Sequence, residues 1–215
     1  MTNSDKQPAA RRRQIPSPIS NYQSWLVLFL LFVGLVAVYL QPQLSESWAF
    51  DRFQFAAQPW LALSHALVHL NLQHLILNLT ALLCIYLLFG AAFESAWWLL
   101  ALALSAVTSA YGLFYYSPQT DWCVGLSGAL HGLFVYAALR SRASLLWIAA
   151  IIVKLTAEQN AWFADSSFLS ATEQFIANPV VVDAHLWGAA GGLVYFGIAR
   201  SVNFIILLVE LNRDR

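Results

Sequence analysis

The stretch GLSGALHG, residues 125–132, places Ser127 and His131 among glycines in a chain otherwise rich in leucine, alanine and aromatic residues. The apolar run that it opens ends after Leu139, at the basic sequence RSR. A helix over residues 125–139 is about 22 Å long, whereas the hydrocarbon core of a bilayer is ~30 Å thick. The stretch therefore predicts a short helix that begins inside the membrane, with Ser127 in its first turn.

The composition also indicates a membrane protein. Of the 215 residues, 60% are hydrophobic and only 10% are charged, whereas a soluble domain carries about a quarter charged residues. The 11 basic and 11 acidic residues balance, and no basic face lies outside the first 13 residues, which argues against nucleic-acid binding. The two cysteines, Cys84 and Cys123, match no metal-ligand spacing.

Six apolar segments are long enough to cross, or nearly cross, a bilayer as helices. They comprise residues 25–40, 70–89, 97–114, 125–139, 144–163 and 180–199. We therefore predict an all-α membrane protein, a bundle of six transmembrane helices. We expect a disordered cytoplasmic tail over residues 1–22, a core over 23–200 and a short C-terminal tail over 201–215. The apolar end of the chain is expected to extend the sixth helix or to lie at the membrane interface.

The basic residues favour one orientation in the membrane, because cytoplasmic loops carry an excess of lysine and arginine. With the N-terminus inside, the inner segments hold Lys6, Arg11, Arg12, Arg13, Arg140, Arg142, Arg200, Arg213 and Arg215. The outer loops hold only Arg52. Both termini are therefore expected in the cytoplasm. The outer loop over residues 41–63 is rich in aromatic side chains, which favours a position in the membrane interface.

Polar side chains within the predicted spans point to a common pocket. His74 and Asn78 lie four residues apart, on one face of the second span. His185 opens the sixth span, at a depth comparable with that of Ser127. Polar groups are costly in a membrane and usually face a bundle interior or a water-filled cavity. We therefore expect these four side chains to converge below the outer membrane surface.

Small residues predict that the fourth and sixth spans approach one another closely. Gly128 in the fourth span and Gly188 in the sixth each begin a small-xxx-small face, which lets two helix backbones come into contact. A hydrogen bond between Ser127 and His185 requires such an approach, because each side chain reaches only a short distance from its helix.

These residue types are typical of nucleophilic catalysis. Ser127 is expected to act as the nucleophile, with His185 as its general base. His74, Asn78 and the backbone N–H of Ser127 are expected to donate hydrogen bonds to a tetrahedral oxyanion. No acidic third member is evident, because Asp183 lies two residues from His185, points elsewhere on the helix and is expected to cap it.

Two other polar pairs have competing interpretations. His65 and His69 have the i, i+4 spacing of metal ligands, so a metal-ion transporter is an alternative. The sequence HExxH is absent, so a zinc protease lacks its general base. Lys154 and Glu158 are also four residues apart, in the fifth span, and are expected to form an ion pair that holds this helix to its neighbour.

Three motifs together resemble the rhomboid intramembrane serine proteases, over about residues 25–200. They are GLSG at residues 125–128, AHLWGAAGG at 184–192 and HALVHLNLQHLILN at 65–78. The resemblance implies a rhomboid-like catalytic core that works without a cofactor or metal. It matches Ser127 to the nucleophile, His185 to the base, and His74 and Asn78 to the oxyanion-hole residues. The residues expected to support this site are Gly125, Gly128, His131 and Gly188.

One departure from the family pattern indicates a subgroup. Many rhomboids have tyrosine four residues after the serine, stacked on the catalytic histidine, where this chain has His131. GLSGALHG together with KLTAEQ, residues 154–159, resembles the rhombosortases. His131 is expected to stack on His185 rather than compete as base, because a residue one turn away on the same helix is poorly aimed at the Ser127 hydroxyl.

The rhombosortase resemblance implies a class of substrate and a location. The substrates would be single-span membrane proteins that end in a Gly-Gly motif, an apolar helix and a basic tail, cut near the outer face. Cleavage would be a sorting step at the bacterial cytoplasmic membrane. The alternatives are an inactive rhomboid-like protein that binds transmembrane helices and the metal-ion transporter.

Overall fold

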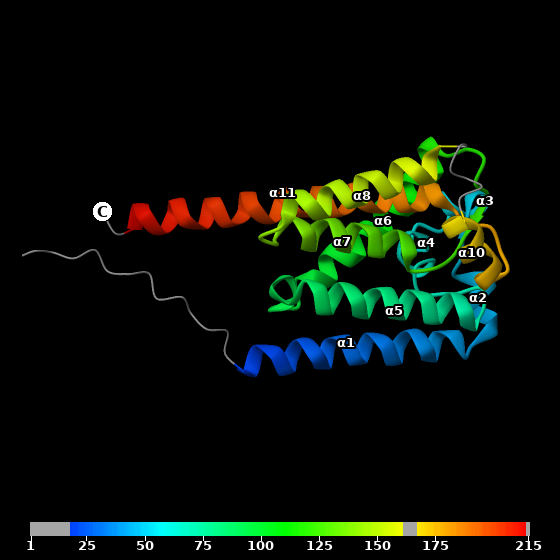
Figure 1. Ribbon diagram of the computed structural model, residues 1–215, viewed down its shortest axis with the longest axis horizontal. Coiled ribbons are helices and arrows are strands. Elements are labelled where there is room, and N and C mark those ends of the chain that lie inside the picture. The colour runs from blue at the N-terminus through cyan, green and yellow to red at the C-terminus, as the bar shows by residue number, and fades with distance from the viewer. Residues whose placement is uncertain (1–17, 161–166, 214–215) are drawn as a thin grey trace, which may run out of the picture.

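The structure, a computed structural model, describes residues 18–160 and 167–213. Long helices dominate this part of the chain (Figure 1): α1 (Pro18–Tyr39), α5 (Leu72–Leu88), α6 (Trp98–Tyr116), α7 (Ser127–Leu139), α8 (Ser144–Gln159) and α11 (Val182–Arg213). Each of them falls on one of the apolar segments identified in the sequence. The predicted helical architecture is therefore confirmed for the described residues, apart from one short pair of strands.

Three of these helices are long and apolar enough to cross a bilayer, over Tyr22–Tyr39, Trp98–Tyr116 and Val182–Arg213. The helices α5 and α7 are apolar but shorter. Helix α8 has 16 residues and carries the charged pair Lys154 and Glu158. The count of six membrane crossings therefore stays a prediction.

The two ends of the helical core differ from the predicted boundaries. Helix α1 begins at Pro18, inside the segment 1–22 that we expected to be a disordered tail. Proline is favoured at the first helical position, because its fixed φ suits the helix and its missing N–H is not needed there. The rest of that tail, residues 1–17, lies outside the described residues, as do residues 161–163 of the fifth predicted segment.

Helix α11 continues to Arg213 without a break at residue 200, where the predicted core ends. The apolar sequence NFIILLVEL, residues 203–211, therefore extends the sixth helix, which is the first of the two arrangements considered for it. In Figure 1 the start of α1 and the end of α11 lie at one end of the bundle. The short helices of the loop after α1 lie at the opposite end.

The aromatic loop after α1 is folded into short elements. They are α2 (Pro42–Ser47), β1 (Phe50–Asp51), α3 (Arg52–Phe55) and α4 (Leu61–Ser64). Strand β1 pairs antiparallel with β2 (Trp122–Cys123), which lies just before α7. Phe50 and Phe55 are buried, whereas Phe53 and Trp60 are exposed. One side of this loop therefore packs on the bundle and positions the segment that leads into α7. A short 3₁₀ helix, η1 (Gly90–Phe93), connects α5 to α6.

Arg52, the lone basic residue predicted for the outer loops, caps α6. Its guanidinium group donates to the carbonyls of Leu113 at 2.6 Å and Phe114 at 2.7 Å, in the last turn of α6. It also donates to Ser117 at 2.6 Å and to Thr120 at 3.0 Å. The last four carbonyls of a helix have no partner within the helix. Arg52 satisfies two of these four and ties the outer loop to α6.

Helix α7 lies in the middle of the bundle and contacts α5, α6, α8 and α11. Its contact with α11 is through glycine. A Cβ on Gly188 would overlap the carbonyl of Gly128, and a Cβ on Gly192 would overlap the carbonyl of Gly132. The predicted close approach of these two helices is therefore confirmed, and it brings the start of α11 next to the start of α7.

Candidate active site

Ser127 is the first residue of α7, whereas the sequence predicted a helix from residue 125 with Ser127 in its first turn. The chain reaches it through Gly125, whose φ of 113° lies in a region that other residues rarely adopt. The N–H of Gly125 donates to the carbonyl of His65 at 2.9 Å, which ties this turn to the end of α4. A Cβ on Gly125 would also overlap the ring of His74. Glycine therefore lets α5 approach the turn that presents the serine.

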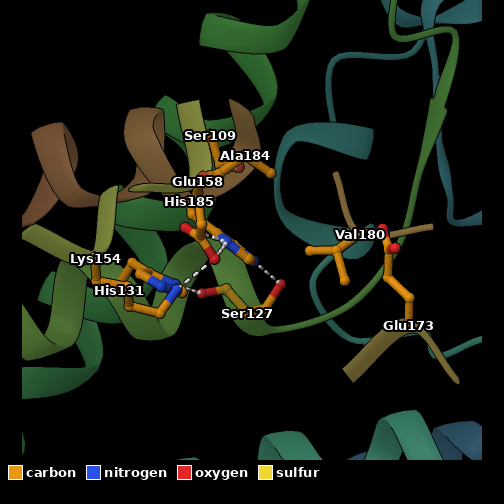
Figure 2. A network of polar contacts seen from close by, with 9 residues as sticks. All are labelled: Ser109, Ser127, His131, Lys154, Glu158, Glu173, Val180, Ala184 and His185. Atoms are coloured by element: carbon orange, nitrogen blue, oxygen red, sulfur yellow. Dashed lines mark hydrogen bonds and ion pairs between the residues drawn. The ribbon is translucent and has the colours of Figure 1, made fainter. Parts of the chain in front are cut away.

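His185, in the first turn of α11, faces Ser127 (Figure 2). Its Nε2 atom lies 3.1 Å from the serine Oγ, and only 5% of the residue is exposed. The two residues are 58 positions apart in the sequence. The structure thus brings together the two side chains that the sequence analysis paired.

His185 has a second partner that the sequence analysis missed. Its Nδ1 atom lies 3.1 Å from each carboxylate oxygen of Glu158, in the last turn of α8. A carboxylate only accepts hydrogen bonds, so Nδ1 carries the proton of this contact. In the neutral ring Nε2 is then an acceptor, and the hydroxyl of Ser127 donates to it.

We expected Glu158 to serve only in an ion pair with Lys154. That pair is present, with Nζ 2.5 Å from Oε1, but the same carboxylate also reaches His185 on α11. Asp183, the acidic residue nearest to His185 in sequence, lies inside the first turn of α11 and accepts from Nε2 of Gln119 at 2.6 Å. The expected cap at Asp183 is therefore wrong. One feature of the sequence could have identified Glu158 as a site residue: it is an acidic residue near the outer end of an apolar helix.

His131 stacks on His185, as expected. The ring centroids are 4.0 Å apart and the ring planes differ by 15°. The Nδ1 atom of His131 donates to the carbonyl of Ser127 at 2.7 Å, one turn earlier on α7. This bond holds the His131 ring against the face of His185 and directs Nδ1 to the backbone, so His131 supports the site through stacking.

The predicted oxyanion-hole residues lie in the same cavity as the serine and the histidine. This cavity of about 440 Å³ is lined by residues of α5, α7, α8 and α11, and by α10 with the loop after it. Among its lining side chains are His74, Asn78, Ser127 and His185. The ring Nδ1 of His74 has no hydrogen-bond partner among the described residues, and Asn78 donates one N–H to the His74 carbonyl at 3.1 Å. Both residues therefore line the cavity, although the unpaired Nδ1 atom of His74 is itself buried.

Cys123 lines the same cavity. It is a buried, free thiol, and burial raises its pKa to about 12. The thiolate is the reactive form of cysteine, so burial makes this side chain a poor nucleophile near neutral pH.

A short helix covers one side of the cavity. Helix α10 (Ser167–Ile176) follows α8 in the chain, and the carbonyl of Ile176 accepts from Nδ2 of Asn71 on the N-cap of α5 at 2.7 Å. Within this cover the carboxylate of Glu173 accepts from the N–H of Val180 at 3.0 Å. The sequence analysis assigned no helix here, because it searched for segments long enough to span a membrane.

The histidines with metal-ligand spacing do not form the best metal-binding group. Nδ1 of His65 donates to the carbonyl of Leu61 at 2.9 Å, and burial lowers the pKa of His65 to about 4. Among the described residues, three donors that lie within 4.8 Å of one another are supplied by His131, Glu158 and His185. His65 therefore holds the outer loop, and among the described residues it is His131, Glu158 and His185 that offer three donors close enough for a metal.

Comparison with known families agrees with this geometry. The family model described as Rhomboid domain matches residues 56–201. The chain belongs to the rhomboid family. Rhomboids are multi-pass membrane proteins and in general intramembrane serine proteases, although inactive members exist. The matched region includes all the side chains described above as lining the cavity of this rhomboid. No curated protein matches the chain.

Proposed function

We propose that this rhomboid is an active intramembrane serine endopeptidase, with Ser127 as nucleophile and His185 as general base. The observation that supports this most directly is the 3.1 Å contact between Nε2 and Oγ, with the Nδ1 proton directed away toward Glu158. A lone histidine used for packing has no need of a serine hydroxyl on one nitrogen and a carboxylate on the other.

The reaction follows from these contacts. Oγ of Ser127 attacks the carbon of the scissile carbonyl while its proton passes to Nε2 of His185, and a tetrahedral oxyanion forms. His185 then gives this proton to the leaving amine as the C–N bond breaks, which leaves an acyl-enzyme. Water gives its proton to His185 and attacks the acyl carbon, and the C–O bond to Ser127 breaks as Oγ recovers the proton.

His74 and Asn78 are proposed to stabilise the oxyanion, together with the backbone N–H of Ser127. The first N–H groups of a helix have no partner within the helix, and the helix dipole favours negative charge at this end. Ser127 starts α7, so its N–H suits an oxyanion formed on the serine. Hydrogen bonds of this kind matter most in the transition state, where the negative charge develops.

Asn78→Ala is therefore expected to lower kcat by on the order of 10²-fold, as for the loss of one oxyanion donor, with KM nearly unchanged. Single-turnover cleavage by purified protein in detergent measures the effect. Asn160→Ala is the matched control, because Asn160 also donates to a carbonyl four residues earlier but lies exposed at the end of α8. A raised KM with wild-type kcat would assign Asn78 to substrate binding instead.

We further propose a rhombosortase-type specificity for membrane proteins with a C-terminal Gly-Gly motif, an apolar helix and a basic tail. Two features support it: the resemblance of residues 125–132 and 154–159 to that subgroup, and the position of the serine. Ser127 starts α7, and strand β2 just before it pairs with β1 of the outer loop, which suits cleavage near the outer end of a substrate helix. A scissile bond must leave its helix to be attacked, and glycine costs a helix ~1 kcal/mol relative to alanine.

The proposed location is the bacterial cytoplasmic membrane, with both termini and the connection between α7 and α8 in the cytoplasm. The supporting observation is the distribution of basic residues between the two ends of the bundle. Arg140 and Arg142 lie in that connection and Arg213 ends α11, whereas Arg52 on the other side is largely buried in its contacts with α6. The exposed positive charges are therefore biased toward one end of the bundle.

The experiment is co-expression with a candidate Gly-Gly-tailed membrane protein, scored by immunoblot for a shortened product. Cleavage by the wild type is expected to fall by at least about tenfold when both glycines are replaced by leucine, because a more stable helix exposes the scissile bond less often. Conservative changes deeper in the apolar helix serve as the control. Equal cleavage of the Leu-Leu substrate would reject this specificity while leaving the assignment of Ser127 intact.

A metal-dependent function is the second candidate, because His131, Glu158 and His185 offer three donor atoms close together. The Lys154 ammonium group at 2.5 Å from Glu158 competes with a cation for that carboxylate, which makes the metal function the weaker proposal. In the co-expression assay, membranes treated with a chelator are expected to cleave at the untreated rate. Loss of cleavage that zinc restores would favour the metal instead.

A further inference from the structure

The contact between Glu158 and His185 has a geometry that an ion pair within α8 does not require. Both carboxylate oxygens lie 3.1 Å from Nδ1, so the ring edge points at the centre of the carboxylate (Figure 2). The Glu158 side chain is 11% exposed and the His185 side chain is 6% exposed. In such a poorly solvated environment a hydrogen bond to a charged group is strong and directional.

We infer that Glu158 is a positioning residue for His185, so that the site works as a serine–histidine–glutamate triad. The inference rests on the proposed function. The carboxylate accepts the Nδ1 proton and thereby fixes the tautomer in which Nε2 is free to take the proton of Ser127. When His185 becomes an imidazolium during the reaction, the carboxylate lies against the new positive charge and stabilises it.

Lys154 orients the carboxylate but does not face the histidine in this way. Its Nζ contacts Oε1 at 2.5 Å, from one turn earlier on α8, and its side chain is 37% exposed. Oε2 contacts Nδ1 of His185 at 3.1 Å. The ion pair therefore keeps Glu158 charged and in place, while the bond across to α11 acts on the reacting histidine.

The His185 ring is held on two sides. Glu158 fixes its Nδ1 edge, and His131 stacks on its face at a centroid distance of 4.0 Å. Rotation of the ring about its Cβ–Cγ bond would break both contacts and move Nε2 away from Ser127. Stacking resists the tilt of the ring but does not select between its tautomers, which leaves that task to Glu158.

Glu158→Gln is the informative substitution, because it keeps the shape of the side chain and removes its charge. The amide both donates and accepts hydrogen bonds, so it no longer dictates which nitrogen of His185 carries the proton. We expect kcat to fall by about 10²–10⁴-fold, with KM unchanged and the thermal unfolding midpoint close to that of the wild type. Glu158→Asp keeps the charge and is expected to recover part of the lost kcat.

Two control variants separate positioning from a structural role. Lys154→Gln breaks the same ion pair but leaves the carboxylate on His185, so it is expected to lose much less turnover than Glu158→Gln. Glu46→Gln makes the same chemical change on α2, at an exposed residue that does not line the cavity. It is expected to leave turnover near that of the wild type.

The readout is the rate at which a fluorophosphonate probe labels Ser127 in purified protein, measured beside substrate turnover. Labelling needs an activated serine, so Glu158→Gln is expected to slow it in step with kcat. If Lys154→Gln and Glu158→Gln lose labelling and thermal stability equally, Glu158 only anchors α8 and the inference is overturned. If Ser127→Ala still cleaves substrate, the proposed function itself fails. If Ser127→Ala is inactive but Glu158→Gln is labelled at the wild-type rate, only the inference fails.

Discussion

Replacing Ser127 or His185 by alanine is expected to abolish cleavage, with kcat lower by on the order of 10⁶-fold for either variant. The double variant is expected to be no slower than either single one, because nucleophile and base act as a unit and each is useless without the other. Turnover of purified variants in detergent, normalised to folded protein, measures this. Both variants are expected to insert in the membrane. Ser127→Ala is expected to unfold at nearly the wild-type temperature, because it loses one side-chain hydrogen bond, whereas His185→Ala also loses the contacts with Glu158 and His131 and is expected to unfold at a lower temperature.

Ser109→Ala is the matched control for the serine. The hydroxyl of Ser109 is buried beside the site and donates to the carbonyl of Ala184 at 3.1 Å, next to His185 in the chain. Its removal deletes a hydroxyl between α6 and α11 without touching the catalytic pair, so turnover is expected to stay near that of the wild type. Wild-type turnover by Ser127→Ala, or an equal loss in Ser109→Ala, would contradict the assignment of the nucleophile.

The helices could be predicted from the sequence because a membrane span needs a long run of apolar residues and little else. The segment that ends at Leu139 is an example. Its length predicted a short helix over residues 125–139 with Ser127 in the first turn, and α7 spans Ser127–Leu139. The ends of the helices are less well determined by the sequence, because a helix continues as long as the next residues can adopt helical backbone angles. Thus α11 runs on to Arg213 and α1 starts at Pro18.

The pairing of Ser127 with His185 could be predicted because few polar residues occur in the spans and glycines mark the faces that meet. Glu158 could not be assigned in the same way. Lys154 one turn earlier gives it a sufficient partner within its own helix, and the sequence does not say how α8 is rotated relative to α11. A long side chain can satisfy a lysine and a histidine together, and only the packing of the helices shows that it does.

The outer loop elements and α10 escaped prediction for a different reason. Their positions depend on single long-range contacts, such as the bonds from Arg52 to the end of α6 and from Asn71 to Ile176. An arginine in a loop reads as a solvated charge until the carbonyls that it caps are known. The bond from Asn71 also holds the end of α10 at the cavity, which Ile176 lines, so the cover of the cavity could not be predicted from the sequence.

Gly188→Ala is expected to lower kcat by more than about 10²-fold, because a misplacement of 1 Å between reacting groups already costs that much. Gly188 lies one turn after His185 on α11, and a Cβ there would overlap the carbonyl group of Gly128, one residue after Ser127 on α7. The overlap is with backbone, so no side chain can move aside and the two helices must separate. The 3.1 Å bond between His185 and Ser127 spans this same contact and would be lost.

Gly197→Ala makes the matched control, because it is the same substitution on the same helix at a position where a Cβ meets nothing within 4 Å. Alanine in a helix interior is intrinsically more stable than glycine by roughly 0.5–1 kcal/mol, so Gly197→Ala is expected to keep wild-type turnover and unfold at the same or a slightly higher temperature. Turnover and thermal unfolding of both variants in detergent separate the two effects of the methyl group. Wild-type turnover in Gly188→Ala would mean that α7 and α11 do not have to touch at these glycines for Ser127 and His185 to react.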